Sequence, residues 1–401
     1  MNSNSAEPAS GIMAKFEEDA LLKQAMQSTG LSDFGDEVFR EGLRVLIEAL
    51  EGEAGLNDFG RAFAQAEIMK HLENRLRVTE DLKRHPEILD VEVATPLIIV
   101  SLPRTGTTLL HNLLAQDPDT RYAATWECNL LSPPPETATW ESDPRVEHFA
   151  RAIEAAHGSG APGFEDLHPM GSTLPEECVV LLGFDFTSQV FNFQFDIPSY
   201  EMWFEEQDLQ SSYETHRRLL QYLQWRCPRK RWVLKTPGHL WGLKELFQVY
   251  PDAQVIETHR DPLRVLASFC SLLSLGLGMT RDSFDAEALG AHWNTSYVKA
   301  LQKSIAFRDS DAASEARFFD VQYGDLVEDP IEMTRKIYRY FGIEYTPVAE
   351  QRMTAYLAEN RKKRHGVHRY SLEQFGLDPR ELKKRFQFYI DRFDVECSFG
   401  L

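Results

Sequence analysis

Short apolar segments alternate with amphipathic segments through the middle of the chain. The mostly apolar runs at residues 98–102, 232–235 and 254–258 have the length and composition of buried strands. The segments at 107–116 and 262–273 follow two of these runs and carry apolar residues at helical spacing. This repetition predicts an α/β fold, in which a parallel sheet is covered by helices on both faces. Ligands of such sheets bind beyond the carboxyl ends of the strands.

The chain before this alternating part is helical in pattern. Apolar residues recur at helical spacing at Phe39, Leu43, Leu46, Ile47 and Leu50. A second helical stretch runs from 59 to 83. We therefore expect a helical N-terminal extension at 1–90 and a main domain at 91–401. Within that domain, residues 119–231 are rich in proline, glycine and aromatic residues, which predicts an insertion that recognises a second substrate.

Composition narrows the class of protein. Of the 401 residues, 43% are hydrophobic, which is enough for a substantial core. The net charge of -19 argues against general nucleic-acid binding, which needs a basic surface. The five cysteines show neither zinc-ligand nor redox spacing, as expected in a reducing compartment. We see no secretory signal and no apolar run near the roughly 20 residues that span a bilayer. The sequence therefore predicts a cytoplasmic protein without a transmembrane segment.

The first candidate site follows the strand at 98–102. It comprises Pro103, Arg104, Thr105, Gly106, Thr107 and Thr108. A glycine turn between a strand and a helix directs backbone N–H groups and the positive end of the helix dipole at an anion. The guanidinium and hydroxyl groups add further donors. In the ATP-binding pattern G-x-x-x-x-G-K-[ST], however, the first glycine would fall at Ser101 and the lysine at Thr107. The segment therefore predicts a phosphate-like ligand other than a nucleoside triphosphate.

A second candidate site follows the strand at 254–258. Arg260 offers a planar fork for a phosphate, and Ser268 lies about two helical turns further on. Asp261 and Pro262 suit the start of the intervening helix. Taken alone, the segment is equally compatible with a capped helix that carries an incidental surface arginine.

Together the two segments resemble the PAPS-dependent sulfotransferase family, in its bacterial type, where PAPS is 3′-phosphoadenosine 5′-phosphosulfate. The resemblance covers about residues 95–395 and implies a P-loop-NTPase-like sheet. It implies that the loop at 103–108 holds the 5′-phosphosulfate, while Arg260 and Ser268 hold the 3′-phosphate. A late basic run, Arg361, Lys362, Lys363 and Arg364, would close on the same phosphate within a C-terminal segment at 355–401. Asp261 stands where the family commonly has asparagine, and we expect it to cap the helix rather than face the ligand.

The resemblance implies direct in-line transfer of a sulfuryl group to an acceptor hydroxyl or amine. Arg104 and Lys235 would neutralise charge on the transferring group and the bridging oxygen, and no metal would be required. A general base must also take the acceptor proton. His168 and Glu127 are the leading candidates, with Glu177 and His239 as further ones.

Two other functions fit parts of the pattern. A kinase-like phosphoryl transferase would need Mg²⁺ and a lysine on the phosphates. A non-catalytic nucleotide-binding protein would bind the nucleotide without sulfating any acceptor. The aromatic-rich insertion favours a small-molecule or lipid-like acceptor over a highly charged glycan. Residues 1–90 could cover the acceptor site or form a homodimer contact.

Overall fold

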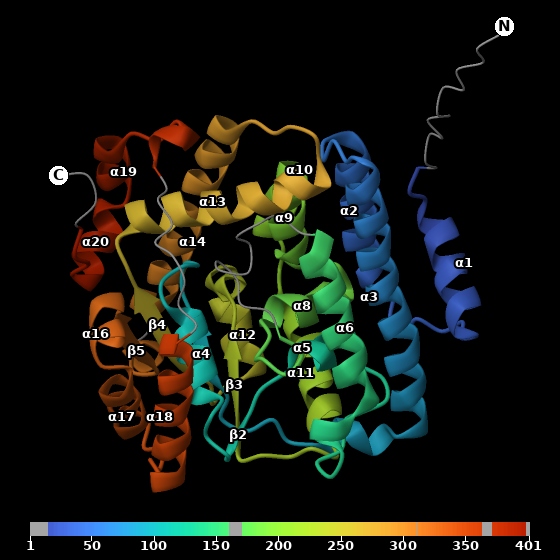
Figure 1. Cartoon of the computed structure of the whole chain (residues 1–401), viewed down its shortest axis with the longest axis horizontal. Helices are drawn as coiled ribbons and strands as arrows, with labels where there is room; N and C mark the ends of the chain where they lie inside the picture. The colour runs from blue at the N-terminus through green and yellow to red at the C-terminus, as the bar shows by residue number, and fades with distance from the viewer. Residues whose placement is uncertain (1–14, 160–170, 311, 363–370, 398–401) are drawn as a thin grey trace, which may run out of the picture.

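The computed structural model describes residues 15–159, 171–310, 312–362 and 371–397. Its centre is a five-stranded sheet in the order β2-β3-β1-β4-β5, and every pairing is parallel (Figure 1). The strands are β1 (Leu97–Val100), β2 (Thr120–Arg121), β3 (Arg231–Lys235), β4 (Gln254–His259) and β5 (Phe318–Gln322). The predicted α/β fold is confirmed, and the three predicted strands are β1, β3 and β4.

Strand β1 explains why helices cover both faces of the sheet. Ile98 and Val100 join a hydrophobic core on one face, whereas Leu97 and Ile99 join a second core on the other. Alternating side chains of one strand thus require apolar partners on both sides. The first core includes residues of α12 (Leu243–Val249), α13 (Pro262–Thr280) and α14 (Ala286–Ser310). The second includes residues of α4 (Thr107–Leu114), α17 (Pro330–Tyr340) and α18 (Pro347–Lys362).

The helical N-terminal region packs into the main domain. It consists of α1 (Glu18–Thr29), α2 (Phe39–Gly52), α3 (Asp58–Arg84) and the 3-10 helix η1 (Pro86–Asp90). Leu43 and Leu72, from α2 and α3, are buried in the same core as α13. At Gly60 the backbone lies so close to Thr280 that a Cβ atom would stand 2.0 Å from the Thr280 carbonyl oxygen. Only glycine permits this approach between α3 and α13.

The predicted insertion at 119–231 begins with the edge strand β2 and continues as short helices. These are α5 (Thr125–Asn129), η2 (Trp140–Ser142), α6 (Pro144–Ser159), α8 (Cys178–Leu182), η3 (Gly183–Asp185), α9 (Val190–Gln194), α10 (Pro198–Glu205) and α11 (Gln210–Gln224). Many of its aromatic side chains, such as Phe186, Phe191 and Tyr200, are buried in the first core. They stabilise the insertion by packing, as aromatic residues usually do.

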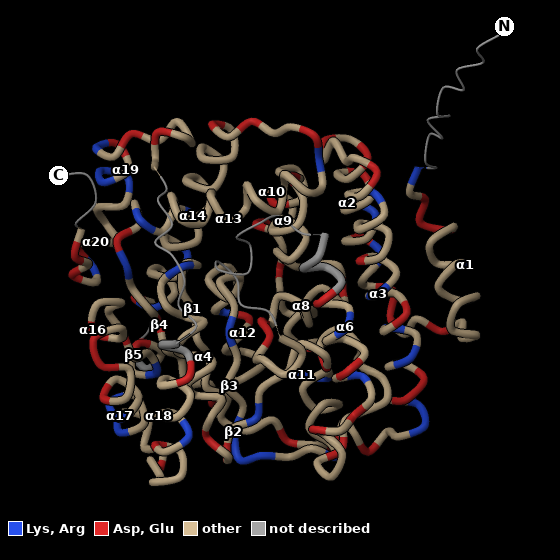
Figure 2. The backbone as a smooth tube through the Cα atoms, viewed as in Figure 1, with Lys and Arg blue, Asp and Glu red and all other residues tan. Residues whose placement is uncertain are grey.

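The remaining elements flank β3 and β5 and end the chain. They are η4 (Pro237–Trp241), α15 (Ala312–Glu315), α16 (Tyr323–Glu328), η5 (Glu373–Phe375), α19 (Pro379–Arg385) and α20 (Gln387–Phe393). Phe386, Tyr389 and Phe393 bury their rings in the first core, so the C-terminal helices are part of the domain. Charged residues of both signs are spread over the outer helices (Figure 2).

Helix α13 corrects one expectation from the sequence. It has 19 residues and is long and apolar enough to cross a membrane, by length and composition only. The sequence analysis overlooked this run. Over half of its apolar window is buried inside the protein, as in the core helix of many soluble proteins. Leu263, Leu266 and Leu273 belong to the first core, so packing accounts for its composition.

Candidate active site

The loop between β1 and α4 has the shape that an anion cradle requires. Arg104 has φ 65° and Gly106 has φ 90°, both in the left-handed region. A Cβ atom on Gly106 would stand 3.0 Å from Leu326 Cδ2 and 3.2 Å from the Tyr323 ring. Glycine is therefore needed here for both conformation and space. The turn brings the amino end of α4 to the carboxyl end of the central strand, where its free N–H groups attract anions.

Not every residue of this loop is available to a ligand. The Thr105 hydroxyl is fully buried and bonds Ser101 Oγ at 2.6 Å, the Leu102 carbonyl oxygen at 2.8 Å and Thr258 Oγ1 at 2.7 Å. Thr105 was expected to give its hydroxyl to the ligand, but this hydroxyl instead ties the loop to β4. Pro103 and Thr107 are also buried, whereas Arg104, Gly106 and Thr108 are partly exposed.

The second predicted segment meets the first. An Arg260 guanidinium N–H donates to the Arg104 carbonyl oxygen at 2.6 Å, and Arg104 Nε donates to Ser268 Oγ at 3.1 Å. Asp261 accepts a hydrogen bond from the Leu263 amide at 3.0 Å and so caps α13, as predicted. Two segments more than 150 positions apart thus form one site.

Tyr323 is a site residue that the sequence analysis missed. The Arg260 guanidinium lies over the Tyr323 ring, 3.9 Å from its centroid. The same ring packs against Gly106. Its only sequence signal is its place directly after a strand, at the edge where Arg104 and Arg260 also lie. Stacking on an aromatic face restrains a guanidinium while leaving its N–H groups free for an anion.

The site fits a phosphorylated ligand. Arg260 Nε is buried and, among the residues that the structure describes, has no hydrogen-bond partner. A buried charged donor without a partner is costly, and a phosphate oxygen would satisfy it. Within the same described ranges, no group of three or more His, Cys, Asp or Glu side chains is arranged to hold a metal ion.

Lys235 and Glu177 form an ion pair at the end of β3. Lys235 Nζ donates to Glu177 Oε1, and Thr236 Oγ1 donates to Glu177 Oε2 at 3.4 Å. The Lys235 side chain is 4% exposed and that of Glu177 is 19% exposed. Glu177 directly precedes α8, so the insertion brings this carboxylate to the sheet edge. A cation and a carboxylate are thus held side by side where the strands end.

Glu127 occupies a different environment. Its side chain is fully buried, and each carboxylate oxygen receives two hydrogen bonds. Oε1 accepts from Arg121 at 2.5 Å and Trp140 Nε1 at 2.9 Å, while Oε2 accepts from Arg121 at 3.0 Å and the Ala124 amide at 2.8 Å. Four donors fill the acceptor positions of a carboxylate. This geometry speaks against Glu127 as the base and favours a role in holding the insertion together.

The other predicted residues fall into two groups. His239 is buried in η4, with Nδ1 2.8 Å from the Tyr213 hydroxyl. Burial, with His216 nearby, lowers the pKa of His239 well below its usual range, so its imidazole is neutral. His168, Lys363 and Arg364 lie outside the described residues. Arg361 and Lys362 end α18, and their side chains lie outside the description as well.

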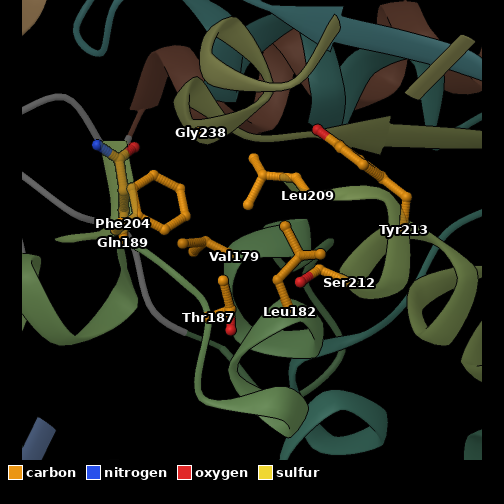
Figure 3. A pocket seen from close by; sticks show the side chains of 9 residues that line it. All are labelled: Val179, Leu182, Thr187, Gln189, Phe204, Leu209, Ser212, Tyr213 and Gly238. Atoms are coloured by element: carbon orange, nitrogen blue, oxygen red, sulfur yellow. The ribbon is translucent and has the colours of Figure 1, made fainter. Parts of the chain in front are cut away.

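A narrow pocket lies beside the turn that follows Lys235 (Figure 3). Its volume is about 10 Å³, near the space of one water molecule. It is lined by Val179, Leu182, Thr187, Gln189, Phe204, Leu209, Ser212, Tyr213 and Gly238. A pocket of this size has no room for a ligand, so it shows only which side chains lie beside the end of β3.

One wall of this pocket is anchored by a buried acid. Gln189 Nε2 donates to Glu201 Oε1 at 2.8 Å, and Ser296 Oγ donates to the same oxygen at 3.1 Å. Burial raises the pKa of Glu201 to about 8. Among the described residues, Glu201 Oε2 has no hydrogen-bond partner. A carboxyl in this position is protonated at neutral pH, because the charged form would be desolvated.

Two arginines in contact at the carboxyl edge of a parallel sheet, with a lysine–carboxylate pair at the end of the neighbouring strand, suit a ligand that carries phosphate-like groups. The comparisons with known proteins give the particular family. Residues 96–347 match the sulfotransferase family, so the chain belongs to that family and is a sulfotransferase. The match contains Arg104, Lys235 and Arg260.

Mycobacterial sulfotransferases are among the similar proteins. The omega-hydroxy-beta-dihydromenaquinone-9 sulfotransferase Stf3 of Mycobacterium bovis is 28% identical over 287 residues, 70% of this chain and 71% of Stf3. The structure of sulfotransferase STF1 from Mycobacterium tuberculosis H37Rv is 35% identical, with a TM-score of 0.83 and coverage of 93% and 98% of the two chains. That of STF9 from Mycobacterium avium is 30% identical, with a TM-score of 0.87 and coverage of 96% and 99%. These relatives share the P-loop-like fold of the family.

Proposed function

We propose that this sulfotransferase transfers the sulfuryl group of PAPS to a hydroxyl at the end of an apolar, lipid-like acceptor. The contact between Arg104 and Arg260 carries the proposal. It joins a loop suited to a 5′-phosphosulfate to a second arginine suited to a separate phosphate. A donor with anionic groups on both its 5′ and 3′ sides would engage both.

The donor would be held by residues at the ends of three strands. Arg104, Gly106 and Thr108 would face its 5′ side, and the N–H groups that begin α4 would add backbone donors. Arg260, stacked on Tyr323, would meet the 3′-phosphate with the Nε atom that lacks a protein partner. PAPS would supply an activated sulfuryl group, while these residues would fix its orientation.

Glu177 is the best-placed base among the described candidates. It would accept the proton of the acceptor hydroxyl, whose oxygen forms the new bond to sulfur as the bond to the bridging phosphate oxygen breaks. Lys235, the present partner of Glu177, would neutralise the charge that develops on the bridging oxygen. After the transfer, Glu177 would hold the proton and Lys235 would lie beside the negatively charged oxygen of the leaving group. His168 remains the other candidate, outside the described residues.

The acceptor part of the proposal rests on two observations. The insertion presents apolar side chains such as Val179, Leu182 and Leu209 beside the Lys235 turn, although the pocket between them has room for only about one water molecule (Figure 3). The relative Stf3 is named for an omega-hydroxy menaquinone derivative, which carries a hydroxyl on a largely apolar molecule. A terminal hydroxyl could approach Glu177 while the adjoining apolar chain packs against the insertion.

Thermal-shift measurements with three ligands test the donor assignment. The ligands are PAP (the product that PAPS leaves), adenosine 5′-phosphosulfate and Mg-ATP. At about a hundred times its dissociation constant, a ligand stabilises the fold by roughly 2.7 kcal/mol. We expect PAP to stabilise most, and Arg260→Ala to lose that advantage over adenosine 5′-phosphosulfate. Arg229→Ala is the control, because Arg229 is exposed at the opposite edge of the sheet.

The outcomes separate the competing functions. Stabilisation by Mg-ATP but not by PAP would contradict the assigned donor and favour phosphoryl transfer. Equal PAP binding by the parent and Arg260→Ala would contradict the assigned phosphate site. PAP binding without sulfation of any hydroxylated apolar probe, such as a long-chain alcohol or a hydroxylated prenyl quinone, would contradict the acceptor class.

A further inference from the structure

A charge cluster around the buried Arg308 and Glu257 lies along the strand that leads to Arg260. Glu257 of β4 and Asp320 of β5 are register partners, so two carboxylates face each other across the sheet. Arg308 of α14, which is 1% exposed, joins them: its guanidinium donates to Glu257 at 2.7 Å and to Asp320 at 2.8 and 2.9 Å. Its two remaining N–H groups donate to Glu315. All five donors of the guanidinium are therefore in use, which fixes the ends of both strands.

His259 connects this cluster to the C-terminal helix α20. It is the last residue of β4 and immediately precedes Arg260. Its Nε2 lies 2.8 Å from Asp320 Oδ1, and its Nδ1 lies 3.2 Å from the Tyr389 hydroxyl. The Phe393 ring stacks on the imidazole with centroids 4.1 Å apart. Both ring nitrogens and one ring face of His259 are therefore occupied by other parts of the chain.

Tyr389 reaches the site through the chain itself. His259 immediately precedes Arg260, so the hydroxyl that contacts the His259 ring also restrains the backbone next to Arg260. The Tyr389 ring is buried, at 1% exposure, and lies beside Phe393, whose ring stacks on the same imidazole. One packed tyrosine thus holds the residue before Arg260 in place.

We propose that Tyr389 is a positioning residue for the nucleotide site, which holds the ring of His259 so that the guanidinium of the next residue, Arg260, faces the 3′-phosphate of the donor. This inference rests on the proposed function, because it requires that Arg260 binds that phosphate. Tyr389 does not touch the donor in this scheme. It acts through Arg260, whose side chain is restrained separately by Tyr323 and by the Arg104 carbonyl.

Tyr389→Phe tests the proposal, because it removes one hydroxyl and keeps the packed ring. The matched control is Tyr338→Phe. Tyr338 is equally buried, at 1% exposure, but its hydroxyl donates to Asp117 within the second core. Both variants lose a buried hydrogen bond, and both should lose some stability. Only Tyr389→Phe should change the nucleotide site.

The readouts are the dissociation constants of PAP and adenosine 5′-phosphosulfate, measured by calorimetry, and steady-state kinetics with PAPS. We expect Tyr389→Phe to weaken PAP about 3–10-fold, the effect of one hydrogen bond, with little change for adenosine 5′-phosphosulfate. KM for PAPS should rise by a similar factor while kcat changes little. Tyr338→Phe should leave all of these values at those of the parent.

Three results would overturn the inference. The first is an unchanged PAP affinity in Tyr389→Phe, while the parent still prefers PAP and Arg260→Ala loses that preference. The second is equal weakening of both ligands, which would indicate general disruption. The third is a similar effect in Tyr338→Phe. If the parent itself does not prefer PAP, it is the proposed function that fails.

Discussion

The proposed nucleotide half and the proposed acceptor half of this enzyme are built in different ways. The nucleotide half takes its groups from positions directly after β1, β4 and β5, where a few residues set the geometry. Arg260 Nε is a buried donor without a hydrogen-bond partner among the described residues, which indicates that this half binds an anion. The acceptor half is built from helices of the insertion, and several of its polar groups bind one another, as Glu127 and Arg121 do. The type of a residue is therefore a better guide to its function when the residue follows a strand than when it lies in the insertion.

Among the variants that test this difference between the two halves, Glu177→Gln should have the largest effect. If Glu177 is the base, sulfuryl transfer should fall by about 10²–10⁴-fold, because the amide cannot take the acceptor proton. PAP binding, measured by calorimetry, should stay close to that of the parent. Single-turnover transfer from PAPS gives the rate of the chemical step.

Glu127→Gln is the companion variant in the same half. We expect it to destabilise the fold by about 3–5 kcal/mol, since Arg121 would be left buried without its charged partner. Chemical denaturation measures this loss, and the folded fraction should keep most of its activity. A stable Glu127→Gln protein with no activity, beside an active Glu177→Gln, would reverse the assignment of the two carboxylates.

The next effect is the pH dependence of the stability of the fold, which we expect Glu201 in the acceptor half to cause. The pKa of Glu201 is raised from 4.5 to about 8 by burial, so the folded state holds a proton that the unfolded chain releases. The stability contributed by this proton is fully present below pH 4.5 and is lost as pH rises to 8. Glu201→Gln keeps a neutral side chain and should remove this loss.

Denaturant unfolding at pH 5 and pH 8.5 measures the difference. Relative to the parent, Glu201→Gln should gain several kcal/mol between these pH values, with roughly 4 kcal/mol as the upper bound. Glu206→Gln, an exposed position just after α10, is the control and should show no such trend. A parent and variant with parallel pH profiles would mean that Glu201 is ionised in the folded protein.

The smallest effect is expected from Tyr323→Leu in the nucleotide half. Loss of the aromatic face beneath Arg260 should weaken PAP about 2–5-fold, as for a partly exposed cation–π contact. Calorimetric titration can resolve this change. Tyr345→Leu is the control. The Tyr345 ring also contacts an arginine, Arg335, but lies away from the site, so PAP binding should be unaffected. A loss of affinity in both variants would point to stability rather than to the stacking contact.

The sequence was sufficient for three of the five strands and for the meeting of the two candidate anion-binding segments. Apolar runs of strand length located β1, β3 and β4, because these strands are buried on both faces. The cap at Asp261 was also predicted correctly, since capping depends on neighbouring residues. Features that depend on a few consecutive positions were thus predictable.

Features that depend on distant partners were not. Strand β5 was not predicted, although three of its five residues are apolar, because Asp320 interrupts the apolar run and the strand is only partly buried. Asp320 is paired with Arg308 and His259, and no local sequence pattern links either residue to it. Glu127 looked like a base because the sequence cannot show that its acceptor positions are filled. Tyr323 carries no motif, and only the arrangement of the strands places it beneath Arg260.

Helix α13 connects the proposed phosphate site to the N-terminal helix α3. Its 19 residues span about 28 Å, from the cap at Asp261 beside the phosphate site to Thr280. At the far end, the Thr280 carbonyl accepts from the Asn57 amide at 3.0 Å, and the Met279 carbonyl accepts from Asn57 Nδ2 at 3.1 Å. Because the helix is held at both ends, its length sets the separation between the proposed phosphate site and the start of α3.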